Sequence, residues 1–186
     1  MSKFSNAFIF HGTAGSPEGN WFPWLKKELE DKGIPTVVPR FPTPEGESLE
    51  AWFEILEAEE QKVNADSLLI GHSKGGMFLL KLLEKLEQPV DTAVFVAAPI
   101  GVKPILYYEE DKKFSNFDFD WQRIVSKANT FIVFHSDNDS YVSMANGEEL
   151  ASHLGVELTF IPNAGHISAS SGFTTFQPLS DKLFQS

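Results

Sequence analysis

Short apolar segments that alternate with longer amphipathic ones are the feature that most constrains the fold of this chain. Six segments are rich in β-branched and aromatic residues, and most of them are apolar throughout, which is typical of strands buried on both faces of a parallel sheet. Helical patterns occupy the intervals between them, as crossovers between parallel strands require. The sequence therefore predicts an open α/β sheet with strands at residues 6–10, 35–38, 67–70, 92–97, 130–134 and 157–161.

Helical periodicity supplies the layers that are expected to cover this sheet. Apolar residues recur at helical spacing in 48–62, where Ser48 is a candidate N-cap, and they occupy most positions of 76–87, which predicts a largely buried helix. The longest connection, 99–129, is expected to hold either a helix that covers the core or a lid on the substrate side. Further helices are expected at residues 20–32, 118–127, 144–154 and 174–184.

Length and charge restrict the partners of this chain. Its 186 residues are expected to form a single domain, 1–186, and the formal net charge of −11 argues against nucleic acid, whose phosphates need clustered basic residues. The chain has no cysteine, which removes disulfides and thiolate chemistry. It shows neither a secretory signal nor an apolar run long enough to span a membrane, so we expect a cytoplasmic protein without membrane contact.

Acidic residues without any intervening base gather in residues 45–60. We interpret them as the solvated face of a helix, and a docking face for a basic partner is the alternative. The acids are Glu45, Glu47, Glu50, Glu54, Glu57, Glu59 and Glu60.

Residues 71–75 read Gly-His-Ser-Lys-Gly and stand between a predicted strand and a predicted helix. This is the context of a nucleophile elbow, G-x-S-x-G, in which bulky side chains two positions from the serine would clash. Such a turn presents the Ser73 hydroxyl and directs the backbone N–H of Lys74 to the place where an oxyanion would form. The alternative is a glycine-rich turn that only changes the direction of the chain.

Partners for a serine nucleophile follow three other predicted strands. Asp137 and Asp139 come after the fifth strand and His166 after the sixth, which is the Ser, Asp, His order expected of the α/β-hydrolase arrangement. The first strand runs into a His-Gly-Thr turn, where we place a second oxyanion donor at the N–H of Thr13. These residues share the C-terminal edge of the predicted sheet, where ligand sites of open α/β sheets lie.

Five segments together carry a family resemblance: HGTAGSPEGNWFPWL, VVPRFP, LLIGHSKGG, SDNDSYV and NAGH. On these segments the chain resembles the small α/β-hydrolase family that includes the retinoblastoma-binding serine hydrolases and many bacterial relatives. The resemblance covers essentially the whole chain. It implies a minimal three-layer α/β/α fold with a six-stranded parallel sheet in the order 2-1-3-4-5-6, and a catalytic triad of Ser73, Asp139 and His166.

Two departures from the family pattern concern the site. Relatives usually have proline after the acid and again three residues later, where this chain has Ser140 and Ser143. Lys74 stands where small or apolar residues are usual. Because of the first departure, Asp137 is kept as the alternative to Asp139, which we favour for its place in the D-x-x-V turn.

The expected function is that of a serine hydrolase cleaving a small ester, thioester or activated amide through an acyl-enzyme. The partner is then a small-molecule substrate, and we expect His11, Trp21, Tyr107 and Tyr108 to contribute to its pocket. No cofactor or metal is expected, because no two histidines share metal-ligand spacing with a carboxylate.

The alternative is a catalytically vestigial protein-interaction module. The retinoblastoma contact of some relatives is attributed to a motif that requires cysteine, which this chain lacks. The oligomeric state is left open.

Overall fold

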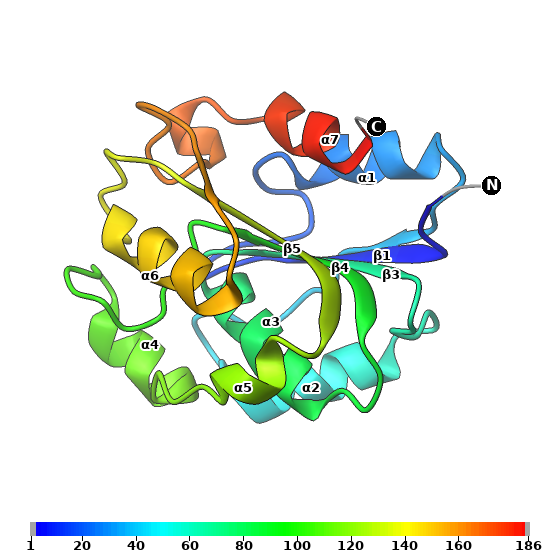
Figure 1. Cartoon of the computed structure of the whole chain (residues 1–186), viewed down its shortest axis with the longest axis horizontal. Helices are drawn as coiled ribbons and strands as arrows, with labels where there is room; N and C mark the ends of the chain where they lie inside the picture. Colours follow the sequence, from blue (N-terminus) through cyan, green and yellow to red (C-terminus); the bar gives the residue numbers. More distant parts are fainter. Residues whose placement is uncertain (1–2, 185–186) are drawn as a thin grey trace.

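A computed structural model describes residues 3–184, which form three layers with a sheet between two layers of helices (Figure 1). All neighbouring strands pair in parallel, in the order β2-β1-β3-β4-β5-β6, so the predicted topology is confirmed. The strands are β1 (Asn6–Phe10), β2 (Thr36–Val37), β3 (Ser67–His72), β4 (Val90–Val96), β5 (Ala128–His135) and β6 (Leu158–Phe160).

The helices divide unequally between the two faces of the sheet. Figure 1 shows α1 and α7 together on one face and α2 to α6 on the other. No helix within residues 3–184 is long and apolar enough to cross a membrane. The helices are α1 (Phe22–Glu30), α2 (Leu49–Ala58), α3 (Lys74–Lys85), α4 (Tyr108–Ser115), α5 (Trp121–Ile124), α6 (Met144–Leu154) and α7 (Gln177–Phe184), with a 3-10 turn at Ala169–Ser171.

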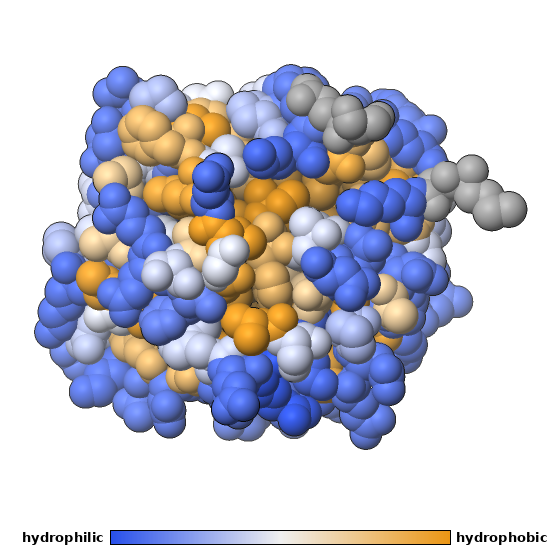
Figure 2. All heavy atoms as spheres, in the orientation of Figure 1, coloured by the Kyte–Doolittle hydropathy of each residue, from blue (hydrophilic) through white to orange (hydrophobic). Residues whose placement is uncertain are grey.

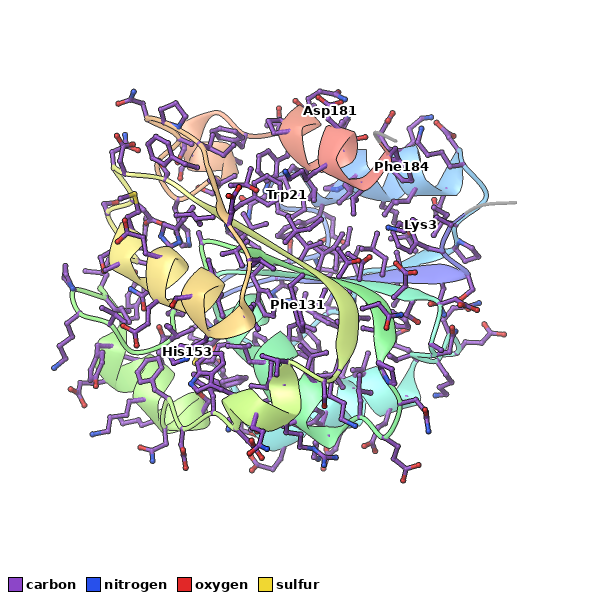
Figure 3. The ribbon with its side chains drawn as sticks, viewed as in Figure 1. Lys3, Trp21, Phe131, His153, Asp181 and Phe184 are labelled. Atoms are coloured by element: carbon purple, nitrogen blue, oxygen red, sulfur yellow. The ribbon has the colours of Figure 1, made fainter. Side chains whose placement is uncertain are left out.

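Two hydrophobic cores, one on each face, explain why the strand segments are apolar throughout. In β1, Phe8 and Phe10 belong to the core beneath α2 and α3, whereas Ala7 and Ile9 belong to the core beneath α1 and α7. All four are fully buried. Trp21, labelled in Figure 3, lies in the second core on the α1 and α7 side of the sheet. Successive side chains of a strand point to opposite faces, so a doubly covered strand needs apolar residues at every position.

Helix α2 ends earlier than the apolar periodicity predicts. It stops at Ala58, and Glu59 is already extended. The Lys62 ammonium folds back and donates hydrogen bonds to the carbonyl oxygens of Glu57 at 2.6 Å and Glu59 at 2.5 Å. A cation that satisfies the last carbonyl groups favours a helix end at this point.

The connection 99–129 contains a helix, α4, that periodicity did not reveal. Its first turn is acidic and its last turn is basic, as the helix dipole favours. Phe114 of α4 packs edge-on against Trp52 of α2, with ring centroids 4.9 Å apart, and so covers the core. Other residues of the same connection reach the cavity described below. This segment therefore covers the core and borders the cavity at once.

Apolar residues gather in the middle of the face seen in Figure 2. A shallow groove there is lined by residues of β5 and β6, including Phe131, Leu158 and Phe160. Strand β6 pairs only with β5 and forms one edge of the sheet, and Phe160 is 47% exposed. Lys182 of α7 also lines this groove, and none of the residues that line it lines the cavity of the candidate site.

Candidate active site

A cavity of about 310 Å³ lies at the C-terminal edge of the sheet. The residues that line it belong to the segments following β1, β3, β4, β5 and β6. This is the edge at which ligands bind in open α/β sheets. Of the residues singled out from sequence, the cavity brings together Thr13, Ser73, Tyr107 and His166.

Ser73 occupies a strained corner between β3 and α3. Its backbone has φ 55° and ψ −128°, a region that residues other than glycine adopt at a cost on the order of 1–3 kcal/mol. The flanking glycines permit it: a Cβ on Gly71 would lie 2.5 Å from the Gly75 carbonyl oxygen, and one on Gly75 only 2.1 Å from the Phe10 carbonyl oxygen. The Ser73 N–H donates to the Val96 carbonyl at 2.9 Å, which ties the corner to β4.

Asp139 and His166 form a close pair. His166 Nδ1 lies 2.7 Å from Asp139 Oδ2, and because an ionised carboxylate only accepts, Nδ1 carries the proton. Asp139 Oδ1 accepts the N–H groups of Tyr141 at 2.8 Å and Val142 at 3.0 Å. Burial opposes ionisation of Asp139, but the His166 ring and these two N–H groups outweigh it and lower the pKa of the carboxyl below its usual value. The carboxylate is therefore charged at neutral pH.

Residues 136–139 hold the loop 163–166 through four consecutive contacts, which we call the loop clamp. Asp137 Oδ1 accepts the N–H of Asn163 at 2.8 Å, so this acid binds backbone while Asp139 binds the His166 ring. The other two contacts are Ser136 Oγ with Ala164 N at 2.9 Å and Asn138 Oδ1 with Gly165 N at 2.7 Å. The clamp fixes the position of His166 from the end of β5.

His72 supports His166 from β3, the strand that carries Ser73. His72 Nε2 donates to the His166 carbonyl oxygen at 2.9 Å. Burial, followed by the nearby His166 charge, lowers the pKa of His72 to about 3, so the ring is neutral. No hydrogen bond joins Ser73 Oγ to the His166 ring within residues 3–184, although both side chains line the cavity. Catalytic hydrogen bonds are often long in free enzymes and tighten with substrate.

Two residues expected in the pocket belong instead to the interior. His11 is fully buried: its Nδ1 donates to the neighbouring carbonyl oxygen at 3.0 Å, and its Nε2 accepts the N–H of Phe41 at 3.1 Å. Trp21 is also fully buried and donates its indole N–H to the Ile167 carbonyl at 3.0 Å. Both side chains support loops of the site from the protein interior, because their ring nitrogens form hydrogen bonds with backbone groups of these loops.

The two tyrosines at the start of α4 have different surroundings. Tyr107 lines the cavity, whereas Tyr108 lies outside it with its ring stacked on Phe117. A third tyrosine, Tyr141, was not expected: it lines the cavity, with its ring centroid 4.9 Å from that of His166. Its place two residues after Asp139, in the turn that carries the acid, is the signal in the sequence.

Two backbone segments border Ser73. Lys74 is the first residue of α3, so its N–H has no acceptor within the helix. Gly12, which precedes Thr13, passes so close to the corner that a Cβ there would lie 2.7 Å from Ser73 Cβ. The Thr13 segment and the start of α3 therefore border the Ser73 hydroxyl from two sides.

The Lys74 side chain turns away from solvent into a cluster of charges. It is 1% exposed, and its ammonium pairs with Glu47 and lies 3.3 Å from Asp111 Oδ1. Glu47 therefore does not belong to the solvated helix face that the acidic run predicted; its side chain is only 12% exposed. Asp111 of α4 lines the cavity, and burial raises its pKa to about 6 against the opposing attraction of Lys74.

Comparisons with known proteins agree with this fold. A family model described as serine hydrolase matches residues 7–185. The hydrolase YdeN of Bacillus subtilis (strain 168) is 27% identical over 176 residues, covering 95% of this chain and 93% of that protein. The crystal structure of the ydeN gene product superposes with a TM-score of 0.87 over 96% of both chains. The serine hydrolase RBBP9 of Rattus norvegicus is 22% identical, with 89% of each chain covered.

Proposed function

The chain belongs to the serine hydrolase family, and on that premise we propose that it cleaves a small ester, thioester or activated amide through an acyl-enzyme on Ser73. That it is a hydrolase rests on the family and on the relatives. The observation that carries the finer proposal is the geometry of the cavity, where a serine on a strained corner faces the same space as a histidine paired with a buried carboxylate.

In the first half of the proposed reaction, Ser73 Oγ attacks the acyl carbon while His166 Nε2 takes its proton. The bond from Nδ1–H to Asp139 holds the imidazole in the tautomer that leaves Nε2 free to accept, and the carboxylate stabilises the imidazolium. The N–H groups of Thr13 and Lys74 stabilise the tetrahedral oxyanion. The start of α3 adds its positive dipole end at the same place.

In the second half, the tetrahedral intermediate collapses and the bond to the leaving group breaks. His166 Nε2–H gives its proton to the departing oxygen, sulfur or nitrogen, and the acyl group stays on Ser73 Oγ. Water then attacks the acyl carbon as His166 takes one of its protons. The second tetrahedral intermediate releases the carboxylic acid, and the proton on His166 returns to Ser73 Oγ.

A fluorophosphonate probe tests this proposal, because only an activated serine reacts with it quickly. The wild-type protein should be labelled and should hydrolyse p-nitrophenyl butyrate, and Ser73→Ala should lose both properties while keeping its circular dichroism spectrum. Ser170→Ala is the matched control, since Ser170 also lines the cavity but lies outside the corner, and its labelling should persist. Labelling of Ser73→Ala at the wild-type rate would refute the nucleophile. Absence of labelling in the wild type would favour the vestigial interaction module.

A further inference from the structure

The wall of the cavity contains a carboxylate whose hydrogen bonds are incomplete. Asp111 is 4% exposed yet lines the cavity. Within residues 3–184, its Oδ1 has no assigned hydrogen-bond partner, and Lys74 Nζ lies 3.3 Å away as an ion-pair partner. A buried carboxylate that is short of donors is unfavourable, and a donor on a molecule that reaches Asp111 from the cavity would compensate for this.

The charges around Asp111 do not balance. One cation, Lys74, faces two carboxylates, and Lys74 makes its hydrogen bond to Glu47. The pair of Lys74 and Glu47 is neutral by itself, so the cluster carries an excess negative charge that lies with Asp111 at the cavity. The ion pair with Lys74 is not the only contact that fixes helix α4, because Phe114 of this helix packs into the hydrophobic core.

We propose that Asp111 determines the specificity of the cavity by binding an ammonium group on the substrate. A protonated amine supplies the positive charge that balances this carboxylate, together with an N–H donor that can approach Asp111 from the cavity. Tyr107 and Tyr141 line the same cavity, and aromatic rings attract cations. The inference rests on the proposed function, because the ammonium must belong to a molecule whose acyl bond is cleaved at Ser73. The substrate class is therefore an amino-substituted ester, thioester or amide.

Matched substrate pairs test this inference on either side of the cleaved bond. For the leaving group, S-[2-(dimethylamino)ethyl] thiobutyrate is compared with S-(3-methylbutyl) thiobutyrate, in which a C–H replaces the ammonium N–H. For the acyl group, p-nitrophenyl piperidine-4-carboxylate is compared with p-nitrophenyl cyclohexanecarboxylate. Each kcat/KM is divided by the hydroxide-catalysed rate constant of the same compound, which removes intrinsic reactivity. We expect the wild type to favour the cationic member of at least one pair about tenfold or more.

The variant Asp111→Asn separates charge recognition from shape. It keeps the size of the side chain, so the cationic preference should fall towards one whatever happens to the absolute rates. Glu109→Gln is the matched control, because it removes the same charge from an exposed position of α4 that neither lines the cavity nor acts on Asp111. Its cationic preference should equal that of the wild type. An Asp111→Asn enzyme that keeps the preference would overturn the proposal, as would a wild type that shows none in either pair.

The pH dependence of the preference gives a second test that needs no variant. The charged groups that act on Asp111 are Lys74, Glu47 and Glu110. Because burial raises the pKa of Asp111 to about 6, its charge is present above that pH and is lost below it. The ratio of the two kcat/KM values should therefore fall as the pH falls through about 6. A ratio that stays constant from about pH 5 to 8 contradicts the assignment.

Failure of this inference and failure of the proposed function give different results. If the neutral substrates are hydrolysed and Ser73 is labelled while no cationic preference appears, the hydrolase mechanism stands and Asp111 serves only as an ion-pair partner of Lys74. If neither neutral nor cationic substrates are hydrolysed and Ser73 does not react, the proposed function itself fails.

Discussion

Replacing Asp139 by asparagine tests the contact on which the proposed mechanism most depends. The amide oxygen of Asn can keep the two bonds that Asp139 Oδ1 accepts from Tyr141 and Val142. The amide nitrogen then takes the place of Oδ2, 2.7 Å from His166 Nδ1 in the wild type. Because that nitrogen is a donor, His166 must offer Nδ1 as an acceptor and move its proton to Nε2. In this tautomer the ring cannot take the proton of Ser73.

The expected loss is large and falls on the chemical step. The corresponding substitution in a Ser-His-Asp protease lowers kcat about 10⁴-fold, and a loss of that size equals about 5.4 kcal/mol of transition-state stabilisation. Stability should change less, by about 1 kcal/mol, because a hydrogen bond to a charged group is replaced by a neutral one while the bonds from Tyr141 and Val142 remain. The two effects are separable by measuring saturating turnover of p-nitrophenyl butyrate and unfolding in urea on the same preparations.

Asp137 supplies the control, since it lies two residues away in the same loop. Its side chain accepts only the Asn163 N–H among the hydrogen bonds from backbone in residues 3–184, and an asparagine oxygen can accept the same bond. We therefore expect Asp137→Asn to keep kcat within about threefold, and Asp137→Ala to lose about 1 kcal/mol of stability. A folded Asp139→Asn with near wild-type turnover, beside a disabled Asp137→Asn, would refute the pairing of Asp139 with His166.

Three further perturbations follow from the same structure. Ser73→Gly should be more stable than Ser73→Ala by about 1 kcal/mol, because glycine relieves the positive φ; equal urea midpoints would show that the corner is unstrained. The free energy of unfolding should fall on acidification from pH 7 to pH 5: the folded-state pKa of His72 is lowered from 6.5 to about 3, so its contribution is complete above the unfolded pKa and is lost as the pH drops towards 3. About 2 kcal/mol of the stability lost between pH 7 and pH 5 comes from this ring. His72→Gln should lack that part of the loss, and a pH dependence equal to that of the wild type would contradict the assignment. Turnover of p-nitrophenyl esters should peak at short to medium acyl chains, given a cavity of about 310 Å³; a peak on long chains would count against this cavity as the acyl site.

The fold could be predicted from the sequence because its signals are local. Each strand segment is apolar on both faces, and the two cores account for that pattern residue by residue, as Phe8 and Ile9 show. The strained corner at Ser73 could be predicted because only glycine fits at the positions two before and two after the serine. Backbone atoms occupy the space that a side chain would need there. Local sequence therefore carried the elements of the parallel sheet and the place of the candidate site, whereas the strand order was implied by the family resemblance.

The parts that could not be predicted depend on contacts between distant segments. Glu47 and Lys74 are 27 residues apart, and no local pattern distinguishes Glu47 from the exposed acids that follow it. Trp21 and His11 were expected in the pocket but are fully buried, because whether an aromatic ring faces a cavity or a core depends on the distant segments packed against it. A core-covering helix was one of two expectations for 99–129, but the bounds of α4 were not predicted because charge order at its ends, rather than apolar periodicity, marks it.

The loop clamp distributes mutational tolerance unevenly between its two halves. On one side the contacts are made by side chains, so each of residues 136–138 must keep an oxygen that can accept a hydrogen bond. On the other side, residues 163–165 contribute backbone N–H groups, so the chemistry of their side chains does not enter these three contacts and the shape of the chain is selected. Asn163 and Gly165 both have φ 55°, which restricts those positions to residues that accept the left-handed region, and proline is excluded throughout because it has no N–H. In a library randomised at residues 136–138 and 163–165 and selected for turnover, positions 136–138 should keep side chains with an acceptor oxygen. Positions 163–165 should keep residues that allow the same backbone conformation.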